Sequence, residues 1–268
     1  MPGAKHIEER IRDFGKRGKV AIIPYITAFD PHRRATLEFL KYIAEAEPVL
    51  IELGFPFSDP IADGPTIQKA IVRALENRPT FEDYLQLVLS FKELFREIPL
   101  VCMTYYNILY RFGLERVVRE AKKAGLDGFI IPDLPIEEAD PWLKVNARSG
   151  LATVFLIAPT STDDRVAKIA RLSSGFLYYV SLTGITGARE VLPEGLDARL
   201  KVLKNLSSIP LAVGFGISKP DHVTLLKPHC DALVIGSALV QIIEREGPSA
   251  GPSLYKFLLS LKHESSNR

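Results

Sequence analysis

The carboxylates of the segment IELGFPFSDPIADGPT, residues 51–66, are the side chains of this sequence best placed to do chemistry. Glu52 stands inside an apolar run, and Asp59 and Asp63 follow it in a loop rich in Pro and Gly. A glutamate in a strand that is covered on both faces is almost never fully buried without a partner or a role. Partial burial raises the pKa of a carboxyl group toward the range useful for a general acid or base. The segment therefore predicts acid–base chemistry, with an internal salt bridge of Glu52 as the alternative.

The two aspartates are weaker signals when each is taken alone. Asp beside Pro or Gly suits turns, and this interpretation fits Asp59 in SDP well. Asp63, in ADGPT, is also placed to begin a helix near Thr66. Each aspartate alone is therefore more typical of structure than of catalysis, and it is the nearness to Glu52 that makes them candidates.

Other reaction classes are disfavoured by the residue types present. A Schiff-base aldolase needs a lysine inside the fold, and no lysine lies within any of the apolar runs. A metal-dependent aldolase needs several histidine or carboxylate ligands. Cys102 and Cys230 lie far apart without a CxxC motif, which predicts inert core filling. Cofactor-free carboxylate catalysis without a metal is the chemistry that is left. The five histidines, of which only the second is expected near the catalytic end, are His6, His32, His222, His229 and His263.

The elements that must position these carboxylates follow a repeating pattern. A short apolar run ends in Gly, Pro, Asp or Thr, and an amphipathic helical segment follows it. This alternation predicts βαβ units and a parallel sheet. Eight such units in about 250 residues fit a (β/α)8 TIM barrel, whereas a doubly wound open sheet is disfavoured because no strand is followed by GxGxxG. The runs are residues 20–26, 49–55, 100–106, 128–133, 152–158, 176–181, 210–216 and 231–237.

Three additional helices are expected outside the repeating units. IEERIRDFGKRG predicts a helix before the first strand, TFEDYLQLVLSFKELF a second helix after strand 2, and PSLYKFLLSLKHE a helix at the C-terminal end. No linker or low-complexity segment interrupts the pattern. We therefore expect a single barrel domain over residues 1–268.

Composition and charge exclude several classes of protein. Apolar residues make up 47% of the chain and charged residues 25%, as in ordinary globular proteins. The net charge of +2 gives no case for nucleic-acid binding. The N-terminal segment lacks an apolar signal core, and no run approaches about 18 uninterrupted apolar residues. A reduced, cytoplasmic protein without a membrane span is expected.

Glycine-bearing loops after strands 6, 7 and 8 predict a phosphate site. They are SLTGITGAR, GFGIS and IGSAL, and the last two each lead from a strand into a helix. Exposed N–H groups at a helix N-terminus bind anions, and the loops after strands 7 and 8 often bind phosphate in this fold. Ser237 is expected to cap its helix and to be a possible ligand. Ordinary tight turns are the alternative. Together with the carboxylates, these loops indicate acid–base work on a small phosphate ester.

The motifs together resemble one family. IELGFPFSDPIADGPTIQKA closely resembles the signature of the tryptophan synthase alpha subunit, and IPYITAFDP, MTYYN, PDLPIEE, YYVSLTGITG, VGFGIS and VIGSALV match it along nearly the whole chain. The resemblance implies a lyase of L-tryptophan biosynthesis. Its reaction is the retro-aldol cleavage of indole-3-glycerol phosphate to indole and glyceraldehyde 3-phosphate.

The resemblance also implies roles for individual residues. Glu52 matches the general acid–base that protonates the indole ring carbon and assists loss of the hydroxyl proton, and Asp63 matches the carboxylate that accepts the indole N–H. Tyr178 matches a tyrosine near the glycerol portion, and Thr186 a threonine that helps to close the site. The other matches are Tyr25, Thr104, Tyr105 and Ile130 for the indole pocket, and Gly187, Gly216, Gly236 and Ser237, with Phe215 beside them, for phosphate.

Two positions depart from the family pattern. Tyr25 stands where many members have Phe, so its hydroxyl needs a partner, and Leu182 stands where some members carry an arginine. The second departure puts in doubt how the loop closes rather than whether the reaction occurs.

The resemblance further implies a partner. In the family this chain binds a beta subunit that carries pyridoxal phosphate, in an alpha2beta2 tetramer, and receives indole through a tunnel. The loop with Asp59 and the segment after MTYYN resemble the parts that face that partner. No cofactor is expected in this chain itself. The alternatives are a stand-alone lyase that releases indole, an idle chain that only activates the beta subunit, and another barrel enzyme such as a sugar-phosphate isomerase.

Overall fold

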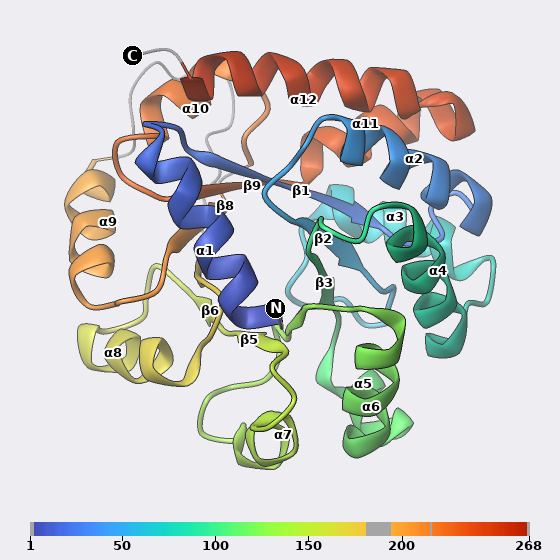
Figure 1. Cartoon of the computed structure of the whole chain (residues 1–268), viewed down its shortest axis with the longest axis horizontal. Helices are drawn as coiled ribbons and strands as arrows, with labels where there is room; N and C mark the ends of the chain where they lie inside the picture. The colour runs from blue at the N-terminus through green and yellow to red at the C-terminus, as the bar shows by residue number, and fades with distance from the viewer. Residues whose placement is uncertain (1–2, 181–193, 215, 267–268) are drawn as a thin grey trace.

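The protein forms a nearly closed barrel of parallel strands surrounded by helices, in a computed structural model that describes residues 3–180, 194–214 and 216–266 (Figure 1). The strands of the described residues pair in the order β5-β4-β3-β2-β1-β9-β8-β7-β6, and every pairing is parallel. The strands are β1 (Ala21–Thr27), β2 (Ile51–Gly54), β3 (Leu100–Met103), β4 (Gly128–Ile130), β5 (Ala152–Val154), β6 (Leu156–Ile157), β7 (Leu177–Val180), β8 (Leu211–Gly214) and β9 (Ala232–Ile235).

The ninth strand arises because one predicted run is divided in two. The run over residues 152–158 is interrupted at Phe155, so that β5 pairs with β4 while β6 pairs with β7. Phe155 packs into the core outside the barrel, whereas Val154 before it packs into the core inside. The eight-unit TIM barrel predicted from the sequence is therefore confirmed.

The barrel separates two apolar cores. The inner core contains Tyr25 of β1, Val101 of β3 and Ile130 of β4, and the outer core, between strands and helices, contains Ile51 and Leu53 of β2. Successive side chains of a strand point to opposite faces. Because both neighbours of Glu52 belong to the outer core, the Glu52 side chain points into the barrel.

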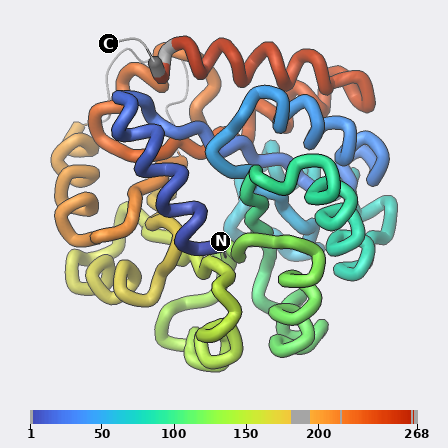
Figure 2. Tube along the Cα trace, in the orientation of Figure 1, coloured from blue at the N-terminus to red at the C-terminus, as the bar shows by residue number. Residues whose placement is uncertain are grey.

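Helices follow the strands around the barrel, and Figure 2 shows the chain passing once around it, so that the blue and red segments meet. The three additional helices predicted from the sequence are confirmed as α1, α4 and α12, while the short α5 before α6 was not predicted separately. The helices are α1 (Gly3–Lys16), α2 (Arg33–Glu45), α3 (Pro65–Leu75), α4 (Phe81–Leu94), α5 (Tyr106–Phe112), α6 (Leu114–Ala124), α7 (Asp140–Asn146), α8 (Asp163–Leu172), α9 (Leu196–Asn205), α10 (Pro220–Leu226), α11 (Ser237–Glu246), a 3-10 turn η1 (Gly247–Ser249) and α12 (Gly251–Ser266).

Helix α1 covers the end of the barrel where the strands begin (Figure 1). Ile7 and Ile11 are fully buried in the inner core. Arg10 Nε donates to the Val49 carbonyl at 2.8 Å, just before β2. With this end covered, the ends where strands finish are left for the site. Among the described residues, no helix has the length and apolar character needed to cross a membrane.

Candidate active site

Glu52 is a buried carboxyl group without a partner. It lies in register between Tyr25 of β1 and Val101 of β3, and it is 1% exposed. Neither of its carboxyl oxygens has a hydrogen-bond partner among the described residues. Burial first, and the charge of Asp63 second, raise the pKa of Glu52 to about 8. The alternative of an internal salt bridge is therefore wrong for the described part of the chain, and the raised pKa favours the protonated form of Glu52 at neutral pH.

Asp63 lies in the loop between β2 and α3 and faces the same end of the barrel. The Tyr105 hydroxyl donates to Asp63 Oδ2 at 2.6 Å, and the Ala62 N–H donates to the Tyr105 hydroxyl at 3.0 Å. Burial raises the pKa of Asp63, and the bond from Tyr105 lowers it. The N-cap position of α3 belongs to Gly64, which makes no side-chain cap bond. The interpretation of Asp63 as a helix-initiating residue is therefore wrong, because its carboxylate is held by Tyr105 instead.

Asp59 behaves as the turn residue that its sequence context predicts. Its side chain accepts a hydrogen bond from Ser58 Oγ at 2.5 Å, and its carbonyl accepts one from the Ile61 N–H at 2.9 Å. Both side chains of the Ser–Asp pair are exposed. Ile61 follows as an 83% exposed apolar side chain on the same loop.

Tyr25 occupies the inner wall next to Glu52. Its ring is 5% exposed, and its hydroxyl lies 3.2 Å from Thr27 Oγ1, which supplies the partner that a buried tyrosine needs. A Cβ on Gly54 of β2 would lie 2.5 Å from the Tyr25 hydroxyl oxygen. Glycine at the end of β2 therefore makes room for the tyrosine beside the catalytic candidate.

Tyr178 of β7 approaches from the opposite side of the barrel. It is 8% exposed, and burial first and the charge of Glu52 second hold its pKa well above the ordinary tyrosine value. A Cβ on Gly214 of β8 would lie 3.0 Å from the Tyr178 ring. Ile130 is fully buried in the inner core with both tyrosines. These side chains surround Glu52 with an apolar wall suited to an aromatic substrate.

Thr104 and Tyr105 lie where β3 ends. Thr104 is 1% exposed, and its hydroxyl is without a hydrogen-bond partner in the part of the chain that the structure describes. Tyr105 is 3% exposed and lies against Phe57, with ring centroids 5.1 Å apart. The structure thus brings the sequence-predicted pocket residues and both carboxylates to one end of the barrel. What sequence reasoning missed is the contact of Tyr105 with Asp63, for which 42 residues of separation give no local signal.

The predicted phosphate end is built from the neighbouring strands β8 and β9. Gly236 is the N-cap residue of α11, and Ser237 is its first helical residue. The expectation that Ser237 caps the helix is wrong, because the chain is already helical there. Gly216, with φ +64°, is exposed after β8. The first N–H groups of a helix have no partner within it, so the start of α11 suits an anion. Thr186, Gly187, Phe215 and Leu182 lie outside the described residues.

The other side chains that could do chemistry have structural roles. His32 Nδ1 accepts the Ala35 N–H at 3.2 Å and so caps α2. Cys102 and Cys230 are buried and free, as predicted. Burial raises the pKa of the Cys102 thiol to about 12. Within the described ranges no cluster of His, Cys, Asp and Glu side chains is arranged to hold a metal ion.

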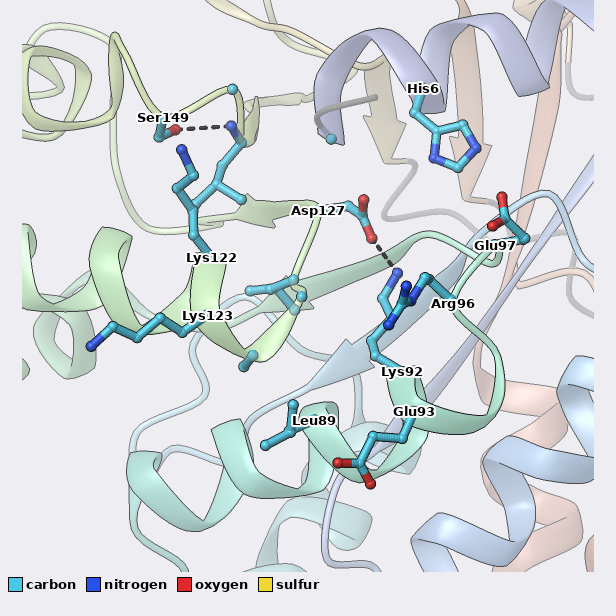
Figure 3. A pocket seen from close by; sticks show the side chains of 16 residues that line it. His6, Leu89, Lys92, Glu93, Arg96, Glu97, Lys122, Lys123, Asp127 and Ser149 are labelled. Carbon is cyan, nitrogen blue, oxygen red and sulfur yellow. Dashed lines mark hydrogen bonds and ion pairs between the residues drawn. The ribbon is translucent and has the colours of Figure 1, made fainter.

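A cavity of about 660 Å³ lies at the other end of the barrel, where the strands begin (Figure 3). Lys92 and Asp127 line it, and Lys92 Nζ donates to Asp127 Oδ2 at 2.6 Å and to the Ile98 carbonyl at 2.8 Å. The same aspartate oxygen accepts the Leu100 N–H at 2.9 Å. The buried charges of this cavity are thus satisfied by one another, which is typical of scaffold rather than of catalysis.

Comparisons with known proteins agree with this geometry. The family model for the tryptophan synthase alpha chain matches residues 11–265. The tryptophan synthase alpha chain of Chloroflexus aggregans is 44% identical over 243 residues, which is 91% of each chain, and that of Pyrococcus abyssi is 45% identical over 87% of this chain and 94% of its own. A chain from the solved tryptophan synthase a2b2 complex of Pyrococcus furiosus superposes with a TM-score of 0.85, at 42% identity, over 91% of this chain and 97% of that one. The protein therefore belongs to the tryptophan synthase alpha chain family.

Proposed function

We propose that this chain cleaves indole-3-glycerol phosphate to indole and glyceraldehyde 3-phosphate, with Glu52 as general acid–base and Asp63 as its charged partner. The observation that carries the proposal is Glu52 itself. It is buried within β2 without a hydrogen-bond partner among the described residues, and its pKa is raised to about 8. A stabilising role would require a partner, whereas a proton donor at neutral pH requires a raised pKa.

The chemistry divides between the two carboxylates. Protonated Glu52 gives its proton to the ring carbon that bears the glycerol chain, and positive charge develops on the indole nitrogen. Asp63 accepts the indole N–H and stabilises this charge. Glu52, now ionised, takes the proton of the adjacent hydroxyl; the C–O bond becomes a carbonyl, the C–C bond breaks, and its electrons restore the aromatic ring. With the hydroxyl proton Glu52 is again protonated, so that no net proton is consumed.

The substrate would bind across the end of the barrel where the strands finish, with its indole on one side and its phosphate on the other. The indole would lie against Ile130, Thr104 and Tyr105, and the glycerol chain near Tyr178. The phosphate would meet the start of α11 at Gly236 and Ser237, together with Gly216. Gly187, Thr186 and Phe215 are proposed on the family resemblance to complete the site. Holding both ends of the substrate fixes the reacting carbon over Glu52.

A beta subunit is the proposed partner. The similar Pyrococcus furiosus protein is part of an a2b2 complex. In this chain Ile61, on the Asp63 loop, is 83% exposed, and Tyr110, on α5, is 68% exposed. These two exposed side chains are the proposed contacts with that partner. Pyridoxal phosphate would belong to the partner, and the reaction proposed here uses only this chain's carboxylates.

The test is an assay of indole release from indole-3-glycerol phosphate, with the chain alone and with a tryptophan synthase beta subunit. Slow release alone, acceleration by the beta subunit, and loss in Glu52→Gln and in Asp63→Asn are expected. Glu93→Gln, an exposed glutamate of α4, is the matched control and should keep full activity. Rapid release that is indifferent to the beta subunit would indicate a stand-alone lyase. Absence of indole under both conditions would overturn the proposed function.

A further inference from the structure

Tyr105 joins two segments that approach the site from different strands. It follows β3, and its hydroxyl reaches across to the loop after β2. There it donates to Asp63 Oδ2 at 2.6 Å and accepts the Ala62 N–H at 3.0 Å. The ring is held by burial and by Phe57 at 5.1 Å between centroids. The hydroxyl is thus fixed as a donor to Asp63, because the Ala62 N–H takes one of its acceptor positions.

The hydrogen bond leaves one side of Asp63 available. Among the described residues, hydrogen bonds engage Asp63 Oδ2 but not Oδ1. An indole N–H can therefore meet Oδ1 while Tyr105 holds Oδ2. Within the described part of the chain, the titratable groups that act on or are affected by this carboxylate are Glu52, Tyr25, Tyr178 and Tyr105. Among the described residues, only Tyr105 donates a hydrogen bond to it, and a donor to a carboxylate favours its ionised form.

Tyr105 also begins the helix that carries an exposed aromatic residue. It is the N-cap residue of α5, and its carbonyl accepts the Ile108 N–H at 3.1 Å. Asp133 Oδ1 accepts the next N–H, that of Tyr106, at 2.8 Å, which anchors this turn to the segment after β4. Tyr110 projects from the same helix with 68% of its surface exposed, and Ile61, two residues before Asp63, is 83% exposed. Each of the two segments that the Tyr105–Asp63 contact joins thus carries an exposed apolar side chain.

We propose that Tyr105 is the positioning residue of Asp63. The inference rests on the proposed function and deepens it by naming the residue that holds the charged carboxylate in place. The bond joins the loop after β2 to the segment after β3, so separation of these two segments would remove the donor that Asp63 has among the described residues.

The experiment compares Tyr105→Phe with the wild-type chain, each alone and with the beta subunit. The ring is kept and only the hydroxyl is lost, so substrate KM should change little. Loss of a hydrogen bond to a charged group should lower kcat by about tenfold to a hundredfold. The acid limb of the kcat/KM profile should move to higher pH, because the donor that favours ionised Asp63 is gone.

Controls separate this role from a structural one. Tyr84→Phe removes another buried hydroxyl, which donates to the Leu53 carbonyl at 2.9 Å. It should lower stability without moving the acid limb. Titration of the Asp63 carboxyl carbon by NMR gives a readout independent of activity, and its midpoint should rise in Tyr105→Phe.

The outcomes distinguish the two proposals. If the wild-type chain releases indole but Tyr105→Phe retains its kcat, acid limb and Asp63 titration, the positioning role is overturned and the lyase stands. If the wild-type chain releases no indole, the lyase is overturned, and the NMR titration alone still decides whether Tyr105 holds Asp63 in its ionised form.

Discussion

Two buried carboxylates lie at opposite ends of the same barrel and differ in their hydrogen-bond partners. Asp127, 9% exposed where the strands begin, is paired with Lys92 at 2.6 Å and accepts the Leu100 N–H at 2.9 Å (Figure 3). Glu52, 1% exposed where the strands end, has no hydrogen-bond partner in the described part of the chain. Burial is compensated by pairing at Asp127, whereas at Glu52 it raises the pKa to about 8 and so favours the neutral form.

The difference follows from what each end of the barrel does. Helix α1 closes the end of the barrel where the strands begin. It starts in contact with Asp127, since a Cβ on Gly3 would lie 2.0 Å from the Asp127 carbonyl oxygen. A saturated ion pair suits a region that must stay closed. The loops that vary between enzymes of this fold lie at the end where the strands finish. A carboxyl group left unpaired there costs stability but is free to give and take a proton, which a paired one cannot do without breaking its partners.

Catalysis gives the sharpest test of this contrast. Glu52→Gln removes the proton donor while keeping the size of the side chain, and general acid–base catalysis contributes about 10²- to 10⁴-fold to a rate. We expect kcat for indole release to fall by that factor. Asp127→Asn, assayed at a temperature where it stays folded, should keep the wild-type kcat. An equal fall in kcat in the two variants would show that catalysis does not depend on one end of the barrel more than on the other.

Stability should respond in the opposite sense. Removing one partner of a buried ion pair costs about 3–5 kcal/mol, because an uncompensated charge remains. Asp127→Asn leaves Lys92 in that position and should lower the free energy of unfolding by this amount, measured in urea at pH 7. Glu52→Gln breaks no hydrogen bond seen among the described residues and should cost little. The comparison fails if Asp127→Asn unfolds at the wild-type denaturant concentration.

The pH dependence of stability isolates Glu52. Its pKa is raised from 4.5 to about 8 in the folded chain, so the folded state binds this proton more tightly than the unfolded state. The corresponding stability is fully present below pH 4.5 and is lost as pH rises through 8, with a slope of at most about 1.4 kcal/mol per pH unit. The difference in unfolding free energy between Glu52→Gln and wild type should therefore grow in favour of the variant from pH 5 to pH 8. A difference that stays constant with pH would contradict the raised pKa.

Sequence reasoning located Glu52 because its signal is local. One charged residue inside an apolar run, followed by a loop of Pro and Gly, is visible in 16 consecutive residues. Lys92 and Asp127 carry no such signal, since 35 residues separate them and each is an ordinary charge in its own segment. The placement of Ser237 within the helix rather than at its cap depends on backbone angles that turn chemistry alone does not fix. Periodicity thus predicted the barrel and its mouth, while the pairings across strands required the fold.

The smallest effect is expected from a matched pair of Thr→Val substitutions. Thr104, at the catalytic end, has a buried hydroxyl with no partner among the described residues, whereas the Thr153 hydroxyl accepts Trp142 Nε1 at 3.0 Å and Asn146 Nδ2 at 2.9 Å. Replacing an unsatisfied hydroxyl by a methyl group is near neutral, but removing an acceptor from buried donors costs about 1–3 kcal/mol. Thermal unfolding should therefore show Thr153→Val clearly destabilised and Thr104→Val unchanged or slightly stabilised. Under the proposed function the Thr104 hydroxyl contacts the substrate, so Thr104→Val should instead raise the KM for substrate. Destabilisation of Thr104→Val to the level of Thr153→Val would mean that the polar groups of the mouth, like those of the scaffold, are there to hold the barrel together.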